Sequence, residues 1–204
     1  QIDHQLQKIL EETSARLCKW LGDANIRGPL PKLNSLPDIA PTAMGLPIED
    51  LLDDLQLVME GSYHPSHPGA LAHLDPPPLT ASIISELICA GLNNNLLAEE
   101  LSPSLSRLER HLCHWFASRL GLINNAGGVV TSGGSLSNLM ALVVARQNSG
   151  LETDSNAVVL ASADAHVSLV KAIRVMGLAQ DALQFVSTDV HGQMSLNALE
   201  EKIF

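Results

Sequence analysis

The spacing of apolar residues divides the chain into a helical first part and a mixed second part. Over residues 2–21 the apolar side chains recur every three or four positions, which predicts an amphipathic helix that stops at Gly22. The same spacing predicts three further helices, over residues 48–59, 79–92 and 103–120. Ser102 as N-cap and Pro103 in the first helical position are typical of the start of the last one.

Two proline-rich stretches interrupt this helical part. Residues 27–47 contain five prolines, which remove backbone donors and favour an extended path. Residues 64–78 contain five more, so neither a long helix nor a central strand can form there. We therefore expect residues 1–60 to be a helical arm with a wrapping segment. Such an arm buries too little surface to fold alone and is expected to pack on a partner subunit.

After Gly121 short apolar runs alternate with helical patterns. The predicted strands are residues 128–131, 157–161 and 184–187, and the predicted helices are 135–148, 167–177 and 195–203. This order predicts an α/β domain with a mostly parallel sheet flanked by helices. Three strands are few for such a domain, so we expect residues 61–204 to be its first, incomplete part. The chain opens without Met and closes within a helical pattern, which also predicts a fragment.

Composition and charge remove several classes of function. The chain has 12 basic and 22 acidic residues, a net charge of −10, and its basic residues are scattered, which argues against a nucleic-acid partner. No apolar run approaches the roughly 18 residues that a membrane span needs. The first residues lack the basic-then-apolar order of a signal peptide. These features favour a cytoplasmic protein.

A glycine-rich turn joins the first predicted strand to the helix after it. Gly133 and Gly134 would let the backbone approach an oxyanion closely, and the helix start would present free N–H groups with Ser135 as a further donor. These residues can therefore form a phosphate site, or equally a tight turn capped by Ser135. The lysine of a P-loop is absent here, as is the GxGxxG pattern.

His166 follows the next predicted strand, so we expect it at the same sheet edge as the glycine turn. An imidazole in that place can stack on a planar cofactor, although a histidine at a helix start can also be a cap or a core group. Two histidine pairs could suggest a metal, namely His111 with His114 and His64 with His67. Zinc needs three or four convergent ligands, and neither pair has the others nearby, so we expect no metal site.

Several ordered motifs support a resemblance to a known family. They are His67-Pro68, Asn93-Asn94-Asn95, Ser102-Pro103 through Glu109 with Trp115, Thr131 through Leu142 with Ala145-Arg146, and Ala165-His166-Val167-Ser168. From about Glu49 to its end the chain resembles the pyridoxal-5′-phosphate (PLP) dependent amino-acid decarboxylases. That group includes aromatic-amino-acid, glutamate, cysteine-sulfinate and diaminobutyrate decarboxylases.

The resemblance implies a type I PLP-dependent transferase-like fold and specific cofactor contacts. It places Gly133, Gly134 and Ser135 at the PLP phosphate, and His166 over one face of the pyridine ring as a catalytic residue. The implied reaction converts an L-amino acid to the corresponding amine and CO₂. It also implies a homodimer.

The resemblance also implies where the amino-acid substrate would lie. His73, Asp75 and Pro76 fall where this family faces the substrate, and Leu97 falls where aromatic-acid decarboxylases place an aromatic residue across the dimer interface. The aliphatic Leu97 and an aromatic content of 3% make an aromatic substrate less favoured.

The lysine that bonds PLP and the aspartate that pairs with its pyridine nitrogen lie, in this family, later in the sequence than Phe204. None of the five lysines here stands in that motif. We therefore expect the chain alone to be inactive and to need the downstream half of the same protein. Two alternatives stay open at this point: another PLP-dependent lyase or aminotransferase of the same fold, and a non-catalytic truncated half or pseudoenzyme.

Overall fold

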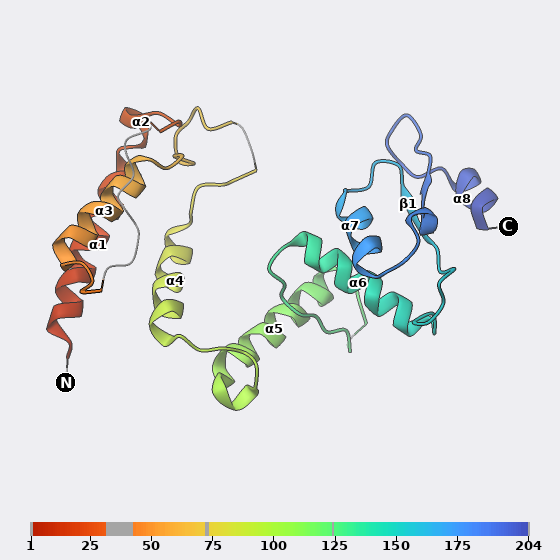
Figure 1. The fold of residues 1–204 in the computed structure, drawn as a ribbon, viewed down its shortest axis with the longest axis horizontal. Coiled ribbons are helices and arrows are strands. Elements are labelled where there is room, and N and C mark those ends of the chain that lie inside the picture. The colour runs from red at the N-terminus through yellow and green to blue at the C-terminus, as the bar shows by residue number, and fades with distance from the viewer. Residues whose placement is uncertain (1, 32–42, 72–73, 124, 204) are drawn as a thin grey trace. The chain divides into compact units, whose positions relative to one another are not determined.

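A computed structural model of the chain describes residues 2–31, 43–71, 74–123 and 125–203. The residues group into two compact units, 1–94 and 95–204 (Figure 1). Each unit is described by itself below. The expected division into an arm over 1–60 and a cofactor domain from residue 61 stays a prediction.

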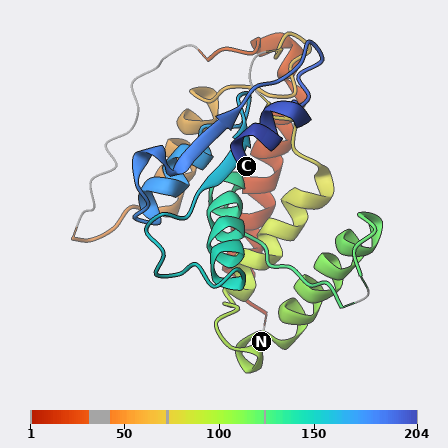
Figure 2. The same cartoon turned by 90° about the vertical axis from the view of Figure 1, so that its right-hand side faces the viewer.

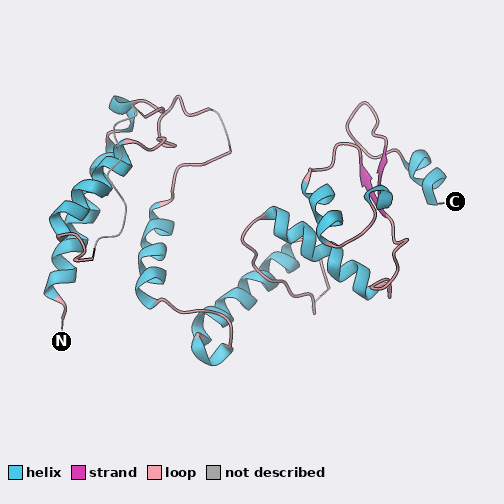
Figure 3. Cartoon of the chain, viewed as in Figure 1, coloured by secondary structure: helices cyan, strands magenta, loops and turns pink. Residues whose placement is uncertain are grey.

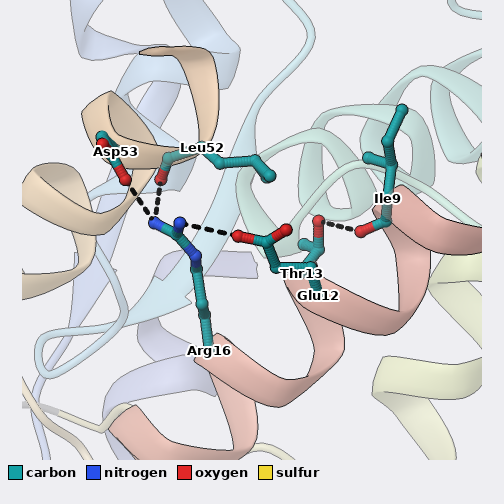
Figure 4. A network of polar contacts seen from close by, with 6 residues as sticks. All are labelled: Ile9, Glu12, Thr13, Arg16, Leu52 and Asp53. Atoms are coloured by element: carbon teal, nitrogen blue, oxygen red, sulfur yellow. Dashed lines mark hydrogen bonds and ion pairs between the residues drawn. The ribbon is translucent and has the colours of Figure 1, made fainter. Parts of the chain in front are cut away.

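Within its described residues the first unit contains four helices: α1 (His4–Gly22), α2 (Ala24–Arg27), α3 (Ile48–Glu60) and α4 (Thr80–Leu92). Helices α1 and α3 lie side by side (Figure 1). Arg16 of α1 connects them, because its guanidinium donates to the Leu52 carbonyl at 3.0 Å and to Asp53 Oδ1 at 2.9 Å. It also donates to Glu12 Oε1 at 2.8 Å, one turn earlier on α1 (Figure 4).

Much of the apolar surface of these helices stays exposed. Leu52 of α3 is buried, but Leu6, Leu55 and Leu87 are each about half exposed. The amphipathic pattern thus forms the predicted helices without enclosing their apolar faces within this unit. In the part of the chain that the structure describes, no helix has both the length and the apolar character to cross a bilayer.

The second unit places helices around a pair of strands. In chain order its elements are the 3₁₀ helix η1 (Glu99–Leu101), α5 (Pro103–Arg119), α6 (Gly134–Asn148), β1 (Val159–Ser162), α7 (Ser168–Val175), the 3₁₀ helix η2 (Gln180–Ala182), β2 (Leu183–Val186) and α8 (Leu196–Ile203). Strands β1 and β2 pair in parallel, with Val159 opposite Leu183 (Figures 2 and 3). Ile173 of α7 packs with Leu178 and Ala182 in the core beside this pair.

The predicted α/β order is confirmed, with one correction. Residues 128–131, predicted as a strand, are not in a β-strand. A strand requires a ladder of hydrogen bonds to a neighbour, whereas the Val130 N–H donates to the Glu109 side chain on α5 at 3.0 Å. An apolar run therefore does not by itself specify a strand, because it does not specify a hydrogen-bonding partner.

Candidate functional site

The turn before α6 has the geometry of an anion site. Gly133 has φ 156° and ψ 165°, a combination that is essentially restricted to glycine. Its carbonyl accepts the N–H groups of Leu136 and Ser137, each at 3.1 Å. The N–H groups of Gly134 and Ser135 precede these donors, and within the described residues neither has an acceptor. Two donors and the positive end of the helix dipole are thus available at an exposed position.

Side chains on both sides hold this turn in place. Thr131 Oγ1 and Ser137 Oγ are 2.6 Å apart, which ties the segment before the turn to the first turn of α6. Thr131 Oγ1 also donates to the Gly133 carbonyl at 3.2 Å. The contact of Glu109 with the Val130 N–H anchors the same segment to α5. The geometry of the turn is therefore supported from two helices.

His166 lies at the carboxyl edge of the strand pair. It follows β1 by four residues, and Thr188, two residues after β2, donates to Asp164 Oδ2 at 3.0 Å. The Ala163 N–H also donates to the Val186 carbonyl at 2.8 Å, which closes this edge. His166 therefore follows a strand at its carboxyl end, as expected, but the glycine turn follows no strand in the described residues, so the expected shared sheet edge is not observed. The imidazole of His166 is exposed.

A hydrogen-bond chain connects His166 to α6. The Ser168 N–H donates to His166 Nδ1 at 3.1 Å, and Ser168 Oγ lies 2.9 Å from the same nitrogen. Asn138 Nδ2 of α6 donates to Ser168 Oγ at 2.8 Å. Ser135 and Asn138 are three residues apart on α6, so they share one helix face. These hydrogen bonds thus connect the face of α6 that carries the glycine turn to the exposed imidazole of His166.

Asn138 and Ser168 were not identified from the sequence as functional residues. Both lie inside the motifs that carry the family resemblance, but they are 30 positions apart, so the sequence does not reveal their contact. The same holds for Glu109 and Val130, which are 21 residues apart. No local periodicity links such pairs.

A mostly apolar groove lies near this region, along α6. It has a volume of about 630 Å³ and is lined by residues 127–129, Thr131, Ser137 and one face of α6 through Met140, Val144 and Asn148. Its lining does not include Gly134, Ser135 or His166. The open turn, rather than the groove, is therefore the candidate cofactor site.

The four residues expected at the substrate fall in different parts of the chain. Asp75 and Pro76 lie in an exposed segment of the first unit without regular secondary structure. Leu97 belongs to the second unit, where it is 88% exposed and its N–H donates to Asn95 Oδ1 at 3.0 Å. His73 lies outside the described residues. The placement of these residues around a substrate stays a prediction.

A family model described as "Pyridoxal-dependent decarboxylase conserved domain" matches residues 31–204. An L-2,4-diaminobutyrate decarboxylase of Rhizobium meliloti (strain 1021) is 28% identical over 201 residues, which are 97% of this chain and 40% of that protein. An aromatic-L-amino-acid decarboxylase of Bacillus atrophaeus is 32% identical over 140 residues, covering 69% of this chain and 29% of that protein. The chain thus spans less than half the length of the curated relatives it matches.

Solved structures show the same fold. The glutamate decarboxylase domain of a diaminobutyrate-pyruvate transaminase and L-2,4-diaminobutyrate decarboxylase from Vibrio parahaemolyticus superposes with a TM-score of 0.87 at 22% identity. The match covers 97% of this chain and 47% of that one. Mouse CSAD superposes with a TM-score of 0.85 at 20% identity, covering the whole of this chain and 45% of that one.

Proposed function

The chain belongs to the family of pyridoxal-dependent decarboxylases, and we propose that it supplies the phosphate cradle and the ring-covering histidine of an L-amino-acid decarboxylase. The reaction would release CO₂ from the α-carboxylate and leave the corresponding amine. One observation carries the proposal: the two open N–H groups at the start of α6 and the exposed His166 belong to one hydrogen-bonded structure.

The residues at the turn fit a phosphate monoester. The Gly134 and Ser135 N–H groups would donate to two phosphate oxygens, and the Ser135 hydroxyl would donate to a third. A Cβ built at Gly133 or at Gly134 meets no protein atom within 4 Å. The space beside both glycines is therefore open to a ligand.

His166 would lie against one face of the pyridine ring. When bound, PLP supplies a conjugated ring that accepts the electrons of the bond being broken. The contribution of His166 is orientation, because a fixed ring keeps the scissile Cα–carboxylate bond perpendicular to the ring plane. An apolar surrounding also favours loss of the charged carboxylate.

The proposed substrate is an L-amino acid that meets His73, Asp75, Pro76 and Leu97.

The exposed apolar faces of α1, α3 and α4 support a homodimer in which these surfaces are covered. The lysine and aspartate that complete the PLP site would come from the downstream half of the intact protein. A cytoplasmic location stays a prediction.

The test uses the intact protein with a panel of amino acids. Purified protein with PLP should convert at least one of them to the amine with equimolar CO₂, measured by chromatography and by trapping of the released gas. A keto acid in place of the amine, with no CO₂ released, would contradict decarboxylation in favour of transamination. No product from any amino acid, together with no PLP binding, would support the non-catalytic alternative.

A matched pair of variants tests the phosphate cradle itself. Gly134→Pro removes one donor yet keeps a residue that suits the first helical position, whereas Gly134→Ala keeps the donor. Loss of a hydrogen bond to a charged group should weaken PLP affinity about tenfold or more in Gly134→Pro. Gly134→Ala should lose less in equilibrium dialysis. Equal affinities in both variants would show that the phosphate binds elsewhere.

A further inference from the structure

We propose that Ser168 and Asn138 are positioning residues. They hold His166 as its Nε2–H tautomer and fix the position of its imidazole relative to helix α6. This inference deepens the proposed function and rests on it, since it assigns a purpose to the orientation of His166. Its central claim about the protonated nitrogen, however, concerns the protein alone.

The direction of each hydrogen bond follows from the one donor that cannot change its role. A backbone N–H only donates, so the contact of the Ser168 N–H with His166 Nδ1 requires an unprotonated Nδ1. The Ser168 hydroxyl, 2.9 Å from the same nitrogen, must then also donate to it. Once this hydroxyl donates, its oxygen is left as an acceptor, and Asn138 Nδ2 supplies the donor at 2.8 Å. The neutral ring therefore carries its proton on Nε2.

Burial makes this arrangement specific. Ser168 is 1% exposed, so water does not compete for its hydroxyl, while the His166 ring that it holds is exposed. Asn138 extends from the same helix whose first N–H groups form the proposed phosphate cradle. A shift of α6 would thus move the phosphate contacts and the ring support together, which keeps their spacing constant.

The first experiment reads the tautomer in intact, cofactor-free protein. Protein labelled with ¹⁵N in histidine is measured by magic-angle-spinning NMR, and the His166 signals are assigned by their loss in His166→Gln. The wild type should show an unprotonated Nδ1 and a protonated Nε2. In Ser168→Ala a second set of signals from the opposite tautomer should appear.

Asn138→Asp is a second, independent variant. A carboxylate cannot donate to the Ser168 hydroxyl but accepts from it, so the hydroxyl should turn away from His166 Nδ1. The same mixed signals are expected, while Ser168→Thr, which keeps the hydroxyl, should restore the single tautomer. Ser155→Ala and Asn156→Asp are matched controls in an exposed loop and should leave the spectrum unchanged.

The second readout is made on the protein loaded with PLP. Ser168→Ala and Asn138→Asp should each lower kcat about tenfold, the value of one ordinary hydrogen bond, with a smaller change in KM. They should also reduce the visible circular dichroism of bound PLP. An unchanged His166 tautomer in both variants would overturn the positioning role whatever happens to activity. A different outcome is mixed tautomers in the two variants together with kcat and visible circular dichroism of bound PLP that do not change in His166→Gln. That outcome would uphold the hydrogen-bond chain and overturn the proposed function.

Discussion

Helix α7 of the second unit and the helices of the first unit use similar amphipathic patterns with different results. In the second unit, α7 and its neighbours enclose Ile173, which is 2% exposed, and Val186 of β2, which is fully buried. In the first unit, α1, α3 and α4 leave large apolar side chains half exposed, as at Leu6 and Leu87. The pattern determines which face of a helix is apolar. Whether that face becomes a core depends on what packs against it.

The polar contacts differ in the same way. The first unit is joined by the partly exposed guanidinium of Arg16, which contacts Glu12 and Asp53 near the surface. The second unit joins α6 to α7 through the buried Ser168 hydroxyl. Surface ion pairs contribute little to stability, whereas a buried hydroxyl that loses its partner carries a larger penalty. We therefore expect substitutions in the second unit to have the larger effects on folding.

The largest effect is expected from Ile173→Ala. Removal of most of a buried side chain that packs with Leu178 and Ala182 should lower the free energy of unfolding by about 2–5 kcal/mol. Val175→Ala on the same helix, where the side chain is 70% exposed, is the matched control and should change it by less than about 1 kcal/mol. Urea denaturation of the intact protein measures both. Equal losses in the two variants would mean that Ile173 is no better enclosed than the exposed Val175, and that α7 has no buried face.

The next largest effect concerns the uncovered face of the first unit. Leu87 of α4 lies beside Ile2, Leu6 and Leu10 of α1 in an open apolar groove. If this face is covered in a homodimer, Leu87→Asp should weaken the dimer at least about a hundredfold, because a carboxylate would be buried without a partner. Ser85→Asp, two positions away on the opposite side of α4, should have little effect. Sedimentation that shows equally stable dimers in both variants would place the interface elsewhere.

A smaller effect is expected at His64, a buried polar side chain of the first unit. Its ring stacks on Trp20 with centroids 4.1 Å apart, and its Nε2 lies 2.9 Å from the Trp20 carbonyl oxygen. His64→Phe should keep the stacking and lose about 1 kcal/mol for the hydrogen bond, while His64→Ala should lose about 3 kcal/mol. Thermal unfolding of the intact protein distinguishes them. A Phe variant as unstable as the Ala variant would show that the hydrogen bond, not the stacking, dominates.

The smallest effect is expected at an exposed ion pair of the second unit. Arg110 donates to both carboxylate oxygens of Glu99, at 2.7 and 3.2 Å, and this hydrogen bonding lowers the pKa of Glu99. A lowered pKa means that the pair stabilises the fold above the ordinary glutamate pKa, and that this stability is lost as the pH falls through the lowered value. Arg110→Gln should therefore destabilise slightly at neutral pH and not at all in strong acid.

A double-mutant cycle with Glu99→Gln isolates the pair from other effects of each substitution. The coupling should shrink at high salt, since both side chains are exposed. A coupling that persists below the titration of Glu99, or that resists salt, would contradict the assignment of the effect to this ion pair.

Local features of the sequence were sufficient to predict most helices. The helix predicted from Pro103 begins there and ends at Arg119, one residue before the predicted end. The short elements α2, η1 and η2 were not predicted, because three or four residues are too few to show a period. The strand predicted over residues 128–131 was wrong, since an apolar run does not specify a hydrogen-bonding partner.

The sequence by itself determined where backbone geometry and side-chain chemistry are local. Gly133, Gly134 and Ser135 define a glycine turn and a helix start within a few residues, so their pattern alone indicates either an anion site or a tight turn capped by Ser135. Only the tertiary structure decided that Asn138 meets Ser168. The physical reason is that a hydrogen bond between residues 30 apart depends on how α6 packs against α7, and packing is a property of surfaces that no single stretch of sequence contains.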